Sequence, residues 1–393
     1  MVIMRWGLIL ALVLAILVLG CSQEEAEKAP TPTPTPEKTA TPTPTMVETP
    51  SKEQVIAEKF QTSLHYTRNG KAYFYSKDNG GFEALTGVPI EKIGCMKCHA
   101  KTKADGSPIE AEEYTPDCND CHVEIGDKPS SKVCLGCHSR QGVEIKLESA
   151  KPELFSDVHR SKGMECIDCH TEEEMHGDGN QYNSMLEGAI KVDCENCHTS
   201  VPENTAHSIH MSKVDCSACH VKTVISCYNC HLESAIKSHV KRPYGPISGF
   251  KFLINFNGKV TTATLMAVQY ENSTFYVIAP FYSHTVTKDI ECSDCHGNEA
   301  LKEYDENGKI VITAWNSTAG KLEWRKGVIP VVPDWSTAFQ FDFLTYTGNT
   351  SDPFKPFDTG NWTFLKHGAD KTQMLFGEPL TEEQLDKLRM NIG

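Results

Sequence analysis

The stretch CSACHVKTVISCYNCH, residues 216–231, contains one five-residue pattern twice: two cysteines separated by two residues, with a histidine directly after the second. The pattern occurs eight times in the 393 residues, beginning at Cys95, Cys118, Cys134, Cys166, Cys194, Cys216, Cys227 and Cys292. Two cysteines in each of eight copies account for 16 of the 17 cysteines, and Cys21 is the remaining one. The chemistry of this pattern therefore decides how the chain folds.

Two thiols and an adjacent imidazole at this spacing are typical of covalent haem attachment, in which the thiols bind the porphyrin vinyl groups and the imidazole binds the iron. The predicted thioether residues are Cys95, Cys98, Cys118, Cys121, Cys134, Cys137, Cys166, Cys169, Cys194, Cys197, Cys216, Cys219, Cys227, Cys230, Cys292 and Cys295. The predicted proximal iron ligands are His99, His122, His138, His170, His198, His220, His231 and His296. The sequence thus predicts eight haem c groups.

Three other uses of paired cysteines fit less well. Zinc ribbons do not need a histidine after every second cysteine. Redox-active pairs of the thioredoxin type are not expected in tandem, and a disulfide framework would not keep a single spacing.

The second axial ligand of each iron decides between electron transfer, with a closed iron, and catalysis at an open one. Eight histidines lie outside the motifs, and all eight are candidate distal ligands: His65, His159, His176, His207, His210, His239, His284 and His367. A neighbouring subunit, a methionine or a lysine near a motif could also supply this ligand; the lysines are Lys191, Lys213, Lys222 and Lys237. The sequence does not pair particular histidines with particular haems.

Motif density limits the fold. Residues 95–231 hold seven motifs, or about 20 residues each, which is too little chain for an ordinary apolar core. We expect little regular secondary structure there, with short helices and loops wrapped on stacked haems and each motif beginning a helical turn. The expected divisions are an N-terminal cover at 53–92, a seven-haem domain at 93–245, and a β-rich region carrying the eighth haem at 246–393.

The N-terminus resembles a lipoprotein export signal. Residues 1–20 combine Arg5 with an apolar run, and Cys21 stands where such a signal is cleaved and lipidated. Residues 21–52 contain Thr-Pro repeats that predict an extended tether. We expect an extracytoplasmic, membrane-anchored protein at the cell surface or outside it. Its net charge of −14 argues against a nucleic-acid partner.

Secondary-structure signals strengthen after His239. Residues 250–256 and 259–268 flank Asn257-Gly258 and predict a hairpin with a type I′ turn. Further strands are expected at 273–282 and 339–346, a second hairpin around 304–315, and a final helix at 381–391 beginning at Thr381. A weaker signal around Asn69-Gly70 predicts a hairpin at 66–75.

The segments 158–170 and 209–220, each a histidine followed by a motif, resemble units of octahaem multihaem c-type cytochromes. The resemblance covers roughly residues 93–300. It implies thioether attachment at each motif and electron conduction through bis-histidine haems, as in surface and nanowire-forming cytochromes, with other redox proteins or further copies of the chain as partners. The alternative is an octahaem oxidoreductase for nitrite, hydroxylamine or tetrathionate with one open haem. No catalytic residue is assigned, and an electron carrier is favoured over an enzyme.

Overall fold

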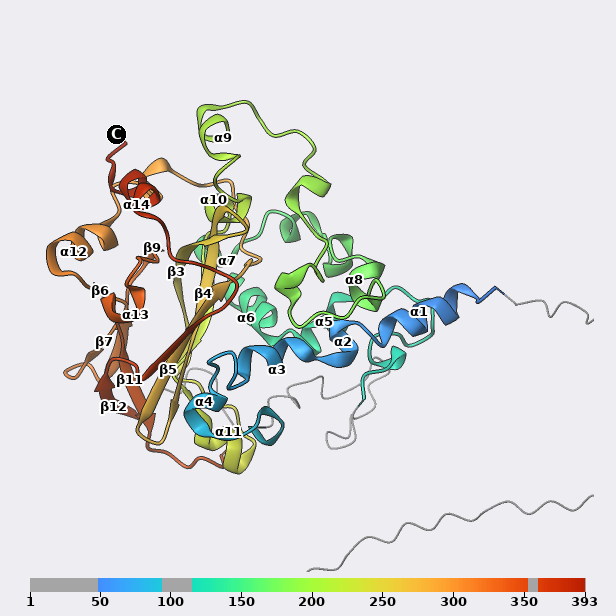
Figure 1. Cartoon of the computed structure of the whole chain (residues 1–393), viewed down its shortest axis with the longest axis horizontal. Helices are drawn as coiled ribbons and strands as arrows, with labels where there is room; N and C mark the ends of the chain where they lie inside the picture. The colour runs from blue at the N-terminus through green and yellow to red at the C-terminus, as the bar shows by residue number, and fades with distance from the viewer. Residues whose placement is uncertain (1–48, 94–114, 353–359, 393) are drawn as a thin grey trace, which may run out of the picture. The chain divides into compact units, whose positions relative to one another are not determined.

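The computed structural model describes residues 49–93, 115–352 and 360–392 (Figure 1). The first motif (Cys95, Cys98 and His99), the leader at 1–20, Cys21 and most of the tether lie outside the described residues. Within the described ranges, no helix has both the length and the apolar character needed to cross a bilayer.

Short helices dominate the first part of the chain, as the motif density predicts. The α-helices are α1 (Lys52–Phe60), α2 (Leu64–Thr67), α3 (Asn69–Tyr75), α4 (Glu83–Thr86), α5 (Ser131–Cys137), α6 (Ser139–Glu148), α7 (Pro152–Phe155), α8 (Glu172–His176), α9 (Thr205–His210), α10 (Cys216–His220) and α11 (Leu232–Ser238). Single 3₁₀ turns lie between them at Ile90–Ile93, Cys118–Asp120, Arg160–Lys162, Cys166–Asp168, Met185–Glu187 and Cys194–Asn196.

A seven-stranded mixed sheet follows, with the strand order β1-β3-β4-β5-β13, β2 beside β4 and β9 beside β3. Its strands are β1 (Val224–Tyr228), β2 (Cys230–His231), β3 (Gly245–Phe256), β4 (Lys259–Tyr270), β5 (Ser273–Pro280), β9 (Gly327–Pro330) and β13 (Lys371–Met374). Because β1 and β2 pair with β3 and β4, the sheet crosses the expected boundary at residue 245.

Three two-stranded sheets and three α-helices complete the C-terminal part. The strands are β6 (Ile310–Val311) with β10 (Phe339–Gln340), β7 (Thr313–Asn316) with β8 (Lys321–Trp324), and β11 (Asp342–Tyr346) with β12 (Trp362–His367). The helices are α12 (Glu299–Asn307), α13 (Trp335–Ala338) and α14 (Glu382–Arg389), and a 3₁₀ turn spans Cys292–Asp294. Figure 1 shows these orange and red segments on one side of the long strands and helices α5, α6 and α8 on the other.

The main apolar core lies on the sheet rather than among the motifs. Phe252, Ile254, Leu265 and Ile278 from the central strands are fully buried, and Phe343 from β11 packs in the same cluster. The motif segments contribute few buried apolar side chains, which agrees with an arrangement in which something other than protein fills the space around them.

Several local predictions are confirmed. Strands β3 and β4 form the expected hairpin, and Asn257 (φ 50°) and Gly258 (φ 78°) both have the positive φ of a type I′ turn. Strands appear at 273–280 and, interrupted at Phe341, at 339–346. Helix α14 begins after Thr381, whose hydroxyl and Gln384 form a capping box.

Two predicted hairpins are wrong. Residues 299–307 form helix α12, because Asn298 caps its N-terminus, Ala300 and Leu301 are buried on one face, and Gly308 ends it in the left-handed conformation. The hairpin in this region joins β7 to β8 instead. Residues 64–75 form α2 and α3, separated by Arg68 in the left-handed conformation, with Ser63 capping α2.

The β3–β4 turn provides a test of backbone strain. A Cβ at Gly258 would meet no neighbouring atom, so the effect of Gly258→Ala comes from its positive φ alone. We expect a loss of about 1–2 kcal/mol in the free energy of unfolding, measured by denaturant titration. Gly245→Ala is the matched control, because that glycine also has open space but no positive φ. Equal losses in the two variants would contradict the turn assignment.

Candidate functional site

Six motif histidines each face one histidine from outside the motifs. Their ring centroids are 6.0–6.3 Å apart, in the pairs His122–His176, His138–His65, His198–His159, His170–His284, His220–His207 and His296–His210. The partners in a pair come from 13 to 114 positions apart in the sequence. The fold therefore brings together six of the eight candidate distal histidines, each with a different motif.

This separation tests whether a haem iron fits between the rings. A metal–imidazole bond is about 2 Å long, and the bonding nitrogen lies about 1.1 Å from the ring centre, so two imidazoles on opposite sides of one metal have centroids about 6.2 Å apart. Aromatic rings in direct contact also have centroids about 4.5–7 Å apart, so it is one separation recurring in six His–His pairs, and not the distance itself, that points to a metal. The six pairs fit a metal between them, and the adjacent thiols fit covalent attachment of its porphyrin.

The motif backbone directs its side chains through a common turn. In five described motifs the histidine N–H donates to the carbonyl of the first cysteine at 2.9 Å: His122 to Cys118, His138 to Cys134, His170 to Cys166, His198 to Cys194 and His296 to Cys292. The sixth, Cys216–His220, is the helical turn α10. The helical turn that we expected at every motif is therefore confirmed in these six. It is wrong for the 227–231 motif, whose residues belong to β1 and β2.

Hydrogen bonds at Nδ1 orient the paired rings. His122 bonds the Asp127 carbonyl at 2.7 Å, His220 the Thr287 carbonyl at 2.9 Å, and His296 the Lys387 carbonyl at 2.7 Å. On the non-motif side, the Nδ1 atoms of His207 and His210 bond the backbone carbonyls of Pro202 and Ala206. An Nδ1 that donates to a carbonyl leaves the Nε2 lone pair available to a metal.

Partial desolvation by the surrounding protein favours the neutral form of several of these imidazoles, although the residues His65, His138 and His284 keep solvent-exposed surface. It lowers the pKa of His138 to about 4, and it also lowers the pKa of His65, His176 and His284. Only a neutral imidazole has the lone pair that binds a metal. The protein environment thus favours the ligand form of both rings in the His65–His138 pair.

Neighbouring motifs are linked through their cysteines. Besides burial, a cysteine of a neighbouring motif helps to raise the pKa of a thiol in five pairs: Cys121 with Cys137, Cys134 with Cys166, Cys169 with Cys197, Cys194 with Cys216, and Cys295 with Cys219. In each motif between the first and the last of this series, one cysteine lies near the preceding motif and the other lies near the next motif. The six motifs therefore form one continuous series in chain order.

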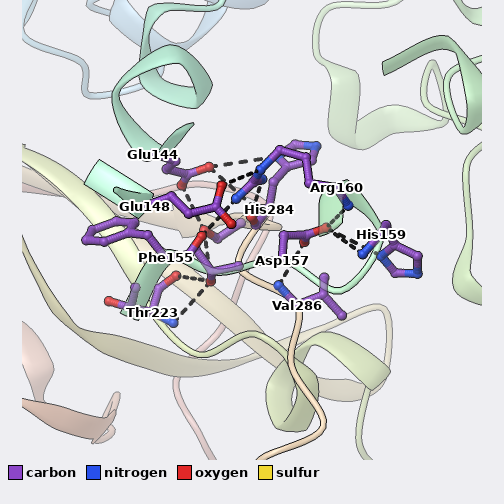
Figure 2. Close-up of polar contacts among 11 residues, drawn as sticks. Glu144, Glu148, Phe155, Asp157, His159, Arg160, Thr223, His284 and Val286 are labelled. Atoms are coloured by element: carbon purple, nitrogen blue, oxygen red, sulfur yellow. Dashed lines mark hydrogen bonds and ion pairs between the residues drawn. The ribbon is translucent and has the colours of Figure 1, made fainter. Parts of the chain in front are cut away.

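A polar cluster around Asp157 fixes two non-motif histidines together (Figure 2). The Asp157 carboxylate accepts the N–H groups of His159, Arg160 and Val286, each at 2.9 Å. Asp157 is 5% exposed, so these bonds are shielded from water. The carboxylate connects the loop of His159 to the loop of His284.

Arg160 and Glu144 complete this cluster. The Arg160 guanidinium donates to the His284 carbonyl at 2.9 Å and to the Glu148 carboxylate at 3.0 Å. The fully buried Glu144 accepts from Ser283 Oγ at 2.7 Å, and its burial raises its pKa. The rings of His159 and His284 belong to two different pairs, so one network positions parts of two neighbouring sites. The spacing of these acidic and basic residues in the sequence did not predict that they would form a cluster.

Lys251 on β3 positions the 216–220 motif. Its ammonium donates to the carbonyls of Ala218 and Val221 at 2.7 Å and of Cys219 at 3.2 Å, although the residue is only 4% exposed. Burial lowers its pKa, and it also interacts electrostatically with Cys295 and Cys219. The buried Lys251 ammonium thus binds the carbonyls at the C-terminus of helix α10. It lies between the 216–220 and 292–296 motifs, which are neighbours in the cysteine series.

The remaining candidate ligands are arranged differently. His239, exposed at the end of α11, and His367 face no motif histidine among the described residues. The His367 Nδ1 is 2.5 Å from the Asp342 carboxylate, and its side chain is 79% exposed. Lys191 forms an ion pair with Asp178, and Lys237 lines a cavity beside His231. Tyr228 and Tyr244 are buried and hydrogen-bonded within the core.

Among the described residues, no three His, Cys, Asp or Glu side chains converge as they do around a zinc ion, and the cysteines of the seven described motifs form no disulfide bonds with one another.

Comparison with known proteins gives two partial similarities. The chain is 26% identical over 125 residues to the cytochrome subunit of an acrylate reductase from Shewanella woodyi, which covers 30% of this chain and 91% of that subunit. It is 27% identical over 145 residues to an uncharacterized protein of Archaeoglobus fulgidus, covering 24% of this chain and about half of that protein, 49%. No family model and no solved structure matches the chain.

The Asp157 cluster generates a prediction about two histidine pairs. Asp157→Ala removes the acceptor of three backbone N–H groups and should lower the free energy of unfolding by about 1–3 kcal/mol. It should also change the visible and paramagnetic resonance spectra of the sites at His159 and His284. The control is Glu153→Ala, an exposed carboxylate on α7, which should change stability by less than about 0.5 kcal/mol. Unchanged spectra in Asp157→Ala would show that the cluster does not position the rings.

Lys251 generates a second prediction. Lys251→Met removes a buried positive charge between the 216–220 and 292–296 motifs, so the reduction potential of at least one redox centre should fall, because a nearby cation favours the reduced state. Potentiometric titration followed by absorption spectroscopy measures this shift. Lys321→Met, at an exposed lysine, is the control and should leave the titration curve unchanged. A curve identical to wild type in Lys251→Met would contradict the assignment.

Proposed function

We propose that this chain is an extracytoplasmic multihaem c-type cytochrome that transfers electrons between other redox proteins. The observation that carries the proposal is the set of six opposed histidine pairs, each with centroids 6.0–6.3 Å apart and each including a motif histidine. Surface or core histidines have no reason to meet at one separation. Imidazole on both sides closes the metal to substrate and favours electron transfer over catalysis.

In this proposal each group has a separate task. Haem, when bound, supplies reversible one-electron chemistry at iron. The motif cysteines hold it covalently, and the paired histidines cap both faces of the metal. Backbone carbonyls at Nδ1, such as those of Asp127 and Thr287, fix the ring orientations. The Asp157 cluster fixes the loops of His159 and His284 relative to each other, and with them the two neighbouring sites to which these histidines belong.

The cysteine series supports a continuous path. The links run through the motifs at 118–122, 134–138, 166–170, 194–198, 216–220 and 292–296. The last motif is 61 residues beyond His231 in sequence, yet Cys295 lies beside Cys219. We propose eight haem c groups in total, one for each motif, with these six in one array.

The similarity to a reductase's cytochrome subunit supports an electron carrier with a separate redox partner. By analogy, we propose that this chain exchanges electrons with another protein. The export signal and Cys21 support attachment to the outer side of a membrane through lipid, a proposal that the mass of the mature N-terminal peptide would test.

The central test is the spin state of individual irons. His284→Ala should convert one low-spin ferric centre to high spin, because it removes one of the two imidazoles of the His170–His284 pair. Electron paramagnetic resonance of the oxidised protein measures this change. Lys288→Ala, an exposed residue on the same loop, is the control and should leave the spectrum as in wild type.

Two outcomes would count against the proposal. A His284→Ala spectrum without a new high-spin signal would show that His284 is not an iron ligand. Absence of covalently bound haem from the exported wild-type protein would remove the proposed function altogether.

A further inference from the structure

The last motif of the cysteine series, 292–296, is bonded to the C-terminal end of the chain. The His296 Nδ1 donates to the Lys387 carbonyl at 2.7 Å. The backbone N–H groups of the next two residues donate to the same C-terminal stretch, at 2.9 Å to the Met390 carbonyl and at 3.1 Å to the Leu388 carbonyl. Three consecutive residues, beginning with the motif histidine, are thus bonded to one short segment.

The close approach of these two segments requires a glycine after the motif. Gly297 has φ 65°, and a Cβ at this position would collide with the side chain of Asn391. The side chain of Asn298 caps the N-terminus of α12 and also donates to the Val328 carbonyl at 3.0 Å. The chain that follows His296 is therefore held by the C-terminal residues as well as by α12 and β9.

The Lys387 carbonyl lies in the last turn of α14. This helix is anchored by Leu385, which is fully buried in the main core. The last carbonyls of a helix have no intrahelical partner and carry the negative end of the helix dipole. The carbonyls that bond the rings of His122 and His220 belong to loops instead. Helix α14 thus directs its C-terminal end at the imidazole of His296.

Arg389 fixes the orientation of this last turn. Its guanidinium donates to both carboxylate oxygens of Asp305 on the adjacent helix α12 (Figure 1), with an Nε–Oδ2 distance of 2.9 Å and an Nη2–Oδ1 distance of 2.8 Å. It also donates to Asp386 on α14 itself, at 2.8 Å. Partly exposed ion pairs add little stability, but two parallel bonds between a guanidinium and a carboxylate allow only one relative orientation. The pair therefore sets how α14 lies against α12 and where the Lys387 carbonyl points.

We propose that Arg389 is a positioning residue for the site at the last motif of the series: it holds the end of α14 on α12 and so aims the Lys387 carbonyl at His296 Nδ1. This inference rests on the proposed function, because it assumes that His296 and His210 bind one iron. An imidazole that donates from Nδ1 to a carbonyl is a stronger electron donor at Nε2, which stabilises the oxidised state of a bound metal. Arg389 therefore keeps the reduction potential of this site low.

The test measures the reduction potential of this site in the full-length Arg389→Met variant. Potentiometric titration followed by absorption and electron paramagnetic resonance spectroscopy should show one centre at a higher potential than in wild type, with the others unchanged. Loss of the positive charge alone would shift the potential in the opposite direction, since a nearby cation favours the reduced state. The sign of the shift therefore separates positioning from a charge effect, and a merely structural role of Arg389 predicts no shift.

Three further variants complete the test. Lys387→Met is the matched control, because it removes a positive charge from the same turn of α14 and leaves the backbone carbonyl in place; it should raise the potential of no centre. His210→Ala identifies the site, since the low-spin signal that it removes should be the one that shifts in Arg389→Met. Arg389→Lys keeps the charge but not the two parallel bonds, so it should give a smaller rise.

Several results would overturn the inference: an unchanged or lower potential in Arg389→Met, a rise at a centre other than the one that His210→Ala opens, or the same rise in Lys387→Met. If Arg389→Met does not accumulate, the milder Arg389→Lys variant decides in the same way. These results leave the proposed electron transfer untouched, whereas absence of all covalently bound haem would contradict the proposed function itself.

Discussion

The structure depends on holding six pairs of imidazole rings with their centroids 6.0–6.3 Å apart. Aromatic rings that only contact one another have centroid separations spread over about 4.5–7 Å, so one separation repeated in six pairs indicates a common cause. The pairs therefore make physical sense around a group that binds both rings and supplies apolar surface. This accounts for the small number of buried apolar side chains near the motifs and for the concentration of the protein's own core on the sheet.

The sheet anchors the motif region through side-chain and backbone contacts. Lys251 on β3 ends the 216–220 turn, and the loop after β5 carries His284 and contacts the Asp157 cluster. Thr287 on the same loop bonds the ring of His220. One short loop thus joins three of the proposed sites. The β-rich part was predicted as a separate region, but it positions the proposed ligands of several sites.

Sequence reasoning predicted some local features correctly, failed at the hairpins expected at 66–75 and 304–315, and gave the long-range features only in part. The motif turns, the Asn257-Gly258 hairpin and the Thr381 cap depend on neighbouring residues, so their spacing was sufficient. The pairing of His65 with His138, or of His170 with His284, depends on tertiary folding that no spacing encodes. The 227–231 motif departs from its expected turn because Tyr228 and Asn229 gain buried partners on β11. Tertiary contacts there outweigh the local preference.

The most direct measurement of the central claim is the position of iron in the purified protein, obtained by anomalous diffraction at the iron absorption edge. The account predicts an iron peak midway between the rings of each of the six histidine pairs, beginning with His65–His138 and His170–His284. Iron peaks elsewhere, or rings that face each other with no iron between them, would contradict it.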